Sequence, residues 1–186
     1  MLSQEPQIRV GIIEKASQLC GTFNGTFYAE QKPLQGDFTF FIKDNSICFE
    51  NSDGSCSAFG KTLVCRHDDD ATFSVDDVTI GINFHWQRKQ RQTFQGDLHL
   101  VLRDDGTLTL INVISVEKYL CSVISSEMSA EAPLELLRAH AITSRSWLVA
   151  MLEREERFVA VPPLHSIQKE NELIRWYDRE DHDIYD

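Results

Sequence analysis

Apolar residues between Val116 and Leu152 recur at intervals of three and four, which is the spacing of one face of an α-helix. The pattern predicts two helices joined by a short turn. The first face consists of Val116, Tyr119, Leu120, Val123, Ile124 and Glu127, and the second of Leu134, Leu137, Ala141, Arg145, Leu148 and Leu152. A carboxylate therefore closes the first stripe, and an arginine interrupts the second.

Glu127 and Arg145 thus carry opposite charges at positions where apolar residues are expected. Charges on the inner faces of consecutive helices are typical of a functional site, but they are equally typical of a structural ion pair. A third reading places Glu127 one residue past the end of its helix, with its side chain in solvent. Desolvation on an apolar stripe would favour the protonated carboxyl, whereas a nearby cation would favour the carboxylate. The spacing leaves these alternatives open.

The chain before residue 116 alternates apolar and polar residues at strand spacing. Asn24-Gly25 predicts a hairpin turn, and Asp97–Val113 predicts a second hairpin that leads directly into the first helix. Further strands are predicted at 7–13, 37–43, 46–50, 61–65 and 71–80. We therefore predict an α+β fold, with a mainly antiparallel sheet and packed helices. Within it, residues 21–90 form a β-rich hairpin subdomain, and residues 95–153 combine a hairpin with the two helices.

The composition is that of an acidic globular protein of 186 residues, with a formal net charge of −11 and 42% hydrophobic residues. This charge argues against a basic surface for nucleic acid or an anionic membrane. No transmembrane run and no export signal are evident, which predicts a cytoplasmic protein unless a signal has been removed. The cysteines lack metal or disulfide spacing, so we expect free thiols and a buried Cys121; they are Cys20, Cys48, Cys56, Cys65 and Cys121.

Trp86 stands beside a basic cluster within the stretch Gly81–Gln90. Aromatic residues next to cations are suited to stacking on sugar rings or on bases. More often, such a stretch is a strand with its aromatic side chains packed inward. We therefore treat Trp86 as a candidate for sugar stacking with that alternative beside it.

The two predicted helices also contain recognisable sequence motifs. The first reads V-E-K-Y-L-C-S-V-I-S-S-E-M from Val116, and the second includes L-E-L-L-R-A-H-A and T-S-R-S, with the arginine at 145. This resembles the SpoIID/LytB family, in which a V-x-x-E-x-Y-L-x-x-V-x-x-x-E-M helix is paired with an L-E-A-L-K-A-Q-A-x-x-A-R-(T/S) helix. Glu127 and Arg145 fall in register with the family's glutamate and arginine.

The resemblance implies cleavage of peptidoglycan glycan strands by a lytic transglycosylase. In that mechanism one glutamate, here Glu127, acts first as acid and then as base to give 1,6-anhydro ends. Arg145 would orient it or bind the glycan, and Ser126 would either hydrogen-bond a sugar or merely end the helix. Three other carboxylates compete for the role, but each is explained by a position at or near a helix start; they are Glu117, Glu131 and Glu135.

The resemblance carries further expectations about partners and metals. The LytB name implies an alternative function, a non-catalytic wall module that binds glycan and stimulates a partner amidase. A glycan substrate implies a site outside the cytoplasmic membrane. The activity requires no cofactor, although some members bind structural zinc through a histidine and two later cysteines. His182 resembles that histidine, but the cysteines are not in this chain, and the family domain is expected to continue beyond residue 186.

Overall fold

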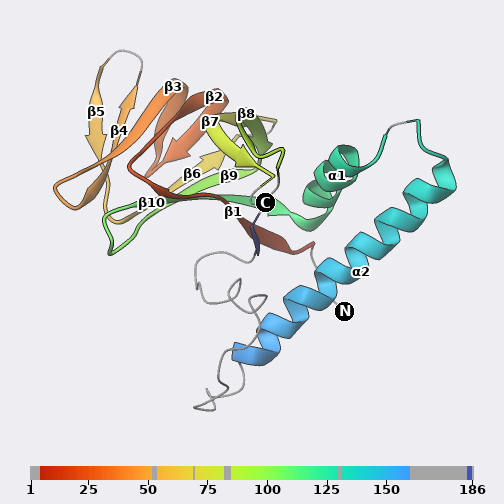
Figure 1. Ribbon diagram of the computed structural model, residues 1–186. Helices are drawn as coiled ribbons and strands as arrows, with labels where there is room; N and C mark the ends of the chain where they lie inside the picture. Colours follow the sequence, from red (N-terminus) through yellow and green to blue (C-terminus); the bar gives the residue numbers. More distant parts are fainter. Residues whose placement is uncertain are drawn as a thin grey trace. The chain divides into compact units, whose positions relative to one another are not determined.

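The computed structural model describes residues 5–51, 54–68, 70–81, 85–129, 131–159 and 184–185. The chain divides into two compact units, drawn together in Figure 1. One comprises Ile8–Ile114 with Ile184–Asp186, and the other comprises Met1–Gln7 with Ser115–Asp183. The boundary falls at the start of the first helix, so the hairpin predicted at residues 97–113 shares a unit with the strands before it.

The larger unit is a mainly antiparallel sheet, as predicted. Its strand order is β11-β1-β10-β9-β6-β2-β3-β4-β5, and β7 pairs with both β2 and β8. Only the short β11 is described as pairing in parallel, with β1. The strands are β1 Gln7–Ala16, β2 Gln18–Ala29, β3 Lys32–Lys43, β4 Ser46–Asn51, β5 Cys56–Ala58, β6 Thr62–His67, β7 Thr72–Ile80, β8 Arg88–Gln95, β9 Asp97–Leu102, β10 Leu108–Ser115 and β11 Ile184–Tyr185.

Asn24 and Gly25 do not form the predicted hairpin turn, because β2 continues through both residues. Its register against β3 shifts between Phe23 and Phe27, which is the mark of a β-bulge. Gly25 has φ = 116°, a backbone conformation that side chains disfavour. The local turn signal is therefore used to bend one strand rather than to end it, since pairing with β3 continues on both sides.

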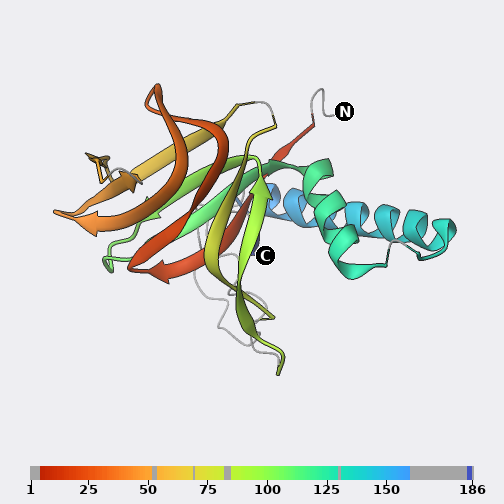
Figure 2. The same cartoon turned by 90° about the horizontal axis from the view of Figure 1, so that it is seen from above.

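The bulge lets β2 pair with two different strands along the same edge. Before the bulge, Gly21 lies opposite Val75 of β7, and after it, Tyr28 lies opposite Arg66 of β6. β3 pairs with both parts. In Figure 2, β7 and β8 lie on one side of β2, and β3 and β4 lie on the other.

One hydrophobic cluster fills the larger unit and draws residues from most of its strands. The alternation in β9 holds as predicted, with Leu98, Leu100 and Leu102 buried. Aromatic rings make up much of the cluster; they belong to Phe23, Phe27, Phe38, Phe40, Phe49, Phe59 and Phe73. The sheet unit therefore has a core rich in phenylalanine.

The predicted hairpin that precedes the helices is confirmed. β9 and β10 pair with Leu100 opposite Leu110, and the turn between them contains Gly106 at φ = 75°. The Asn112 side chain donates hydrogen bonds to the carbonyls of Gln95 and Asp97 at 2.8 and 3.2 Å, which fixes the end of this hairpin. Because β10 ends at Ser115, the first helix begins directly from it.

The smaller unit contains the two predicted helices, α1 at Val116–Glu127 and α2 at Leu134–Val159. The Ser115 hydroxyl accepts a hydrogen bond from the Lys118 amide and caps the start of α1. At its other end, the Met128 amide donates to the Ile124 carbonyl while the chain becomes extended. Within the described residues, neither helix combines the length and apolar character needed to cross a membrane.

We expect replacement of Phe40 by alanine to lower the free energy of unfolding by about 3–5 kcal/mol. Phe40 is fully buried, with the rings of Phe38 and Phe49 at 4.9 and 5.4 Å, so truncation leaves a cavity in the core. Urea denaturation checks this, and Tyr28→Ala on the outer surface is the control, since Tyr28 is 41% exposed. Equal losses in the two variants would contradict the assigned core.

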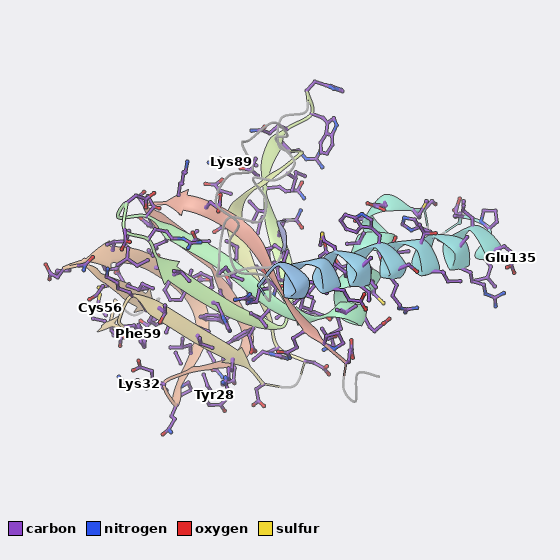
Figure 3. All side chains as sticks on the ribbon, turned by 90° about the horizontal axis from the view of Figure 1, so that it is seen from below. Tyr28, Lys32, Cys56, Phe59, Lys89 and Glu135 are labelled. Atoms are coloured by element: carbon purple, nitrogen blue, oxygen red, sulfur yellow. The ribbon has the colours of Figure 1, made fainter. Side chains whose placement is uncertain are left out.

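We also expect the cysteines to differ in reactivity toward iodoacetamide. Burial, with a smaller contribution from the charge of Asp97, raises the pKa of the Cys65 thiol to about 12. Cys56 on the edge strand β5, labelled in Figure 3, is exposed. So is Cys121, whose expected burial is wrong because it lies off the apolar stripe of α1. Peptide mass spectrometry should find Cys56 and Cys121 alkylated first, and Cys65 only after unfolding. Early labelling of Cys65 would contradict the described core.

Candidate active site on the helix hairpin

Glu127 is the last residue of α1, and it contacts a histidine of α2. Its Oε2 lies 2.9 Å from Nε2 of His140. The Glu127 side chain is 57% exposed, whereas that of His140 is 18% exposed. A carboxyl group open to solvent is therefore held on one side by a largely buried imidazole.

The desolvation expected for Glu127 from its stripe position is not observed. Burial along the stripe falls toward the end of the helix, from buried Leu120 through half-buried Val123 and Ile124 to exposed Glu127. The cause is the helix end itself, because the chain turns extended at Met128 and no further turn covers the carboxyl. The Glu127 side chain thus faces solvent, as the third reading expected, although Glu127 is the last residue of the helix rather than one residue past its end.

Arg145 does not pair with Glu127 but with Glu117. Nε of Arg145 donates to Oε1 of Glu117 at 2.8 Å, and Nη2 donates to Oε2, so the contact has two prongs. The hydrogen bond from Arg145 holds the pKa of the Glu117 carboxyl below its ordinary value, and the Glu117 carboxylate in turn raises the pKa of Arg145. Both side chains are about half exposed. The structural ion pair of this hairpin therefore uses the carboxylate at the start of α1.

The two polar contacts show how the helices pair. Glu117, near the start of α1, contacts Arg145, whereas Glu127, at the end of α1, contacts the earlier residue His140. The helices therefore run antiparallel, as they do in an αα-hairpin. Leu120 and Leu148, 4% and 1% exposed, are buried side chains of the two helices.

Ser126 donates a hydrogen bond to the Val123 carbonyl at 2.8 Å, and Ser125 donates to the Cys121 carbonyl. Both hydroxyls thus bond the backbone of the last turn of α1, and Ser126 is exposed beside Glu127. A hydroxyl that donates to the backbone still has lone pairs to accept a hydrogen bond. The bond to Val123 therefore matches the expectation that Ser126 ends the helix.

The remaining predicted site residues lie elsewhere. Trp86 belongs to the sheet unit, where it is 47% exposed in a turn, and its ring lies against Gly81 at φ = 67°. His182 lies outside the described residues. In the described part of the chain, no group of three or more histidine, cysteine or acidic side chains is arranged to hold a metal ion.

His140 is the residue of this site that sequence reasoning missed. Its Nε2 faces Glu127, and its Nδ1 is buried without a hydrogen-bond partner among the described residues. One feature of the sequence marked this residue: position 140 is histidine, whereas the family motif has glutamine there. That difference could be interpreted only once the helix pairing was known.

We expect the Glu117 contact to stabilise the hairpin at neutral pH and not in acid. A carboxyl whose folded pKa is lowered contributes stability above its unfolded pKa of about 4.3, and this contribution disappears as pH falls through the lowered folded value. Glu117→Gln should therefore lower Tm by a few degrees at pH 7 and by less at pH 3, as measured by circular dichroism.

The matched control is Glu135→Gln, which removes an exposed pair with Arg138 within one helix. Such pairs contribute little, so its Tm should change only slightly at either pH. An equal effect of Glu117→Gln at both pH values would contradict the assigned role of the ion pair.

Comparison with known proteins supplies the family. Residues 104–185 match the model of the SpoIID family, described as Stage II sporulation protein. The matched segment contains β10 and both helices, and with them Glu127, His140 and Arg145. Searches of curated proteins and of solved structures gave no match. The family is associated with cell-wall lytic activity. Residues 104–185 of this chain therefore belong to the SpoIID family.

Proposed function

We propose that the protein is a lytic transglycosylase that cleaves peptidoglycan glycan strands, with Glu127 as its acid and base. The observation that carries this proposal is the Glu127–His140 contact at the end of α1. It supplies a carboxyl that is open to a polymer in solvent and fixed in orientation by a second side chain. The contact uses Oε2, so the proposal assigns proton transfer to Oε1.

The proposed reaction needs one carboxyl group and no water. Protonated Glu127 gives its proton to the leaving glycosidic oxygen as the bond from the anomeric carbon to that oxygen breaks. The carboxylate then takes the proton of the sugar's own 6-hydroxyl, whose oxygen bonds to the anomeric carbon. A 1,6-anhydro ring forms, and Glu127 ends in its starting protonation state.

His140 suits both halves of that cycle. Nε2–H of a neutral imidazole can donate a hydrogen bond to Oε2 of the carboxylate, and it can still donate to Oε2 as the carbonyl oxygen when the proton is on Oε1. The same 2.9 Å contact therefore serves before and after proton transfer. In the proposal, substrate binding provides the exclusion of water that the exposed Glu127 lacks on its own.

Glu117 supports the choice of a mechanism with a single carboxyl. A hydrolase normally places a second acidic residue across the scissile bond. Both oxygens of Glu117 accept hydrogen bonds from Arg145, which commits that carboxylate to holding the helices. Arg145 is accordingly proposed as a positioning residue, acting on the frame that carries Glu127 and His140.

Family membership supports the substrate class, since the SpoIID family is associated with cell-wall lytic activity. We propose glycan strands as the partner and the cell envelope as the place of action. A wall amidase remains a proposed partner under the alternative function, in which the chain binds glycan without cleaving it.

We expect Glu127→Gln to lower glycan-strand cleavage by about 10²–10⁴-fold, the usual contribution of a general acid or base. The substrate is purified glycan lacking stem peptides, and the products are identified by mass spectrometry. The wild type should release fragments with 1,6-anhydro ends. Glu131→Gln is the control, because Glu131 is an exposed carboxylate on the segment between the helices and should leave cleavage unchanged.

Three outcomes would overturn the proposal. Reducing ends in the products would mean hydrolysis with a second carboxylate. An equal loss of cleavage in Glu127→Gln and Glu131→Gln would mean that removing either carboxylate has the same effect, so Glu127 would have no specific role. Glycan binding without cleavage by the wild type would favour the non-catalytic module that stimulates an amidase.

A further inference from the structure

Trp147 is the most exposed large hydrophobic side chain described in the protein, at 65%. A tryptophan in this state is unusual on a soluble protein, because burying an indole is strongly favourable. Trp147 lies on α2, the same helix as His140. Its exposure leaves the indole open to a ligand.

Position along the helix connects Trp147 to the candidate site. Trp147 follows His140 by seven residues, which is close to two full turns, so both lie on nearly the same face about 10 Å apart. Helical side chains lean toward the N-terminus of their helix, which for Trp147 is the direction of His140. The indole is thus in line with the contact that holds Glu127.

Two of the residues next to Trp147 on this face are small or polar, whereas Met151, one turn further along, is half-buried. Thr143, one turn nearer His140, is exposed and donates its hydroxyl to the Ala139 carbonyl at 2.9 Å, keeping acceptor capacity. Ala150, on the other side of Trp147, is exposed and too small to cover the ring. An open aromatic face bordered by hydroxyls fits a ligand that is apolar on its ring face and polar at its edges.

We infer that Trp147 is a stacking platform for a sugar ring of the glycan strand, at a subsite about two helical turns from His140. A pyranose presents C–H groups on its face and hydroxyls at its edge, which match the indole and its polar surroundings. The distance from His140 is of the order of a disaccharide, so one strand can reach both residues. This inference rests on the proposed function, because it takes its ligand from that proposal.

The test measures glycan binding by calorimetry, with soluble glycan strands lacking stem peptides and the full 186-residue chain carrying Glu127→Gln to prevent cleavage. In that background, Trp147→Ala and Trp147→Leu should weaken binding roughly tenfold, and Trp147→Phe should lose much less because it keeps an aromatic face. Ile142→Ala is the matched control. Ile142 is 64% exposed on the same helix, but it points away from the Trp147 face, so its truncation should not change affinity.

The outcomes separate this inference from the proposed function. Unchanged affinity in Trp147→Ala, or an equal loss in Ile142→Ala, would overturn the stacking role and leave cleavage by Glu127 standing. Failure of the Glu127→Gln parent to bind glycan would overturn both. The stacking role would also be overturned if Trp147→Ala lost affinity for glycan and Trp147→Leu did not. That result would show a requirement for bulk rather than for an aromatic ring, as expected of a protein-binding surface.

Discussion

The β-bulge at Asn24 and Gly25 is the constraint on which the sheet unit depends. A regular β2 would pair with one neighbour on each edge, but the bend lets one edge serve β7 before the bulge and β6 after it. β6 then pairs with β9, and β9 pairs with β10. Removing the bend would disconnect the β7–β8 hairpin or the β6–β9 pair from β2. The phenylalanine cluster draws on strands from both sides of this branch.

The helix unit depends on a different kind of contact. Its buried side chains, such as Leu120 and Leu148, supply hydrophobic packing that is non-directional, and they do not alone fix how one short helix lies on another. The two-pronged contact between Arg145 and Glu117 is directional, since a planar guanidinium meets both carboxylate oxygens. It occurs in the same antiparallel pairing of the helices as the His140–Glu127 contact. We therefore assign the ion pair a positioning role, and Glu127 is left outside it.

Local patterns predicted those parts of the structure that local interactions determine. The period of the apolar residues in 116–152 located both helices, and the alternation around Asp104-Asp105-Gly106 located the β9–β10 hairpin. The Asn24-Gly25 signal failed because the turn propensity of two residues competes with pairing to β3 on both sides, which sequence does not display. The pairing of Arg145 with Glu117 was missed for the same reason. Helix spacing shows which face a residue occupies, but not which residue of the next helix it meets.

His140 illustrates how the pairing of the helices changes the chemical reading of a motif. With Arg145 beside it, Glu127 would be held as a carboxylate by a permanent cation, which opposes the role of proton donor. With a neutral imidazole beside it, the carboxyl has a partner whose Nε2–H can donate to Oε2 whether or not Oε1 carries a proton, so neither protonation state is left without a hydrogen bond. A residue that must act as acid and then as base needs a neighbour that tolerates both states. The exchange of partners, Arg145 to Glu117 and His140 to Glu127, is what makes a mechanism with one carboxyl physically reasonable on this hairpin.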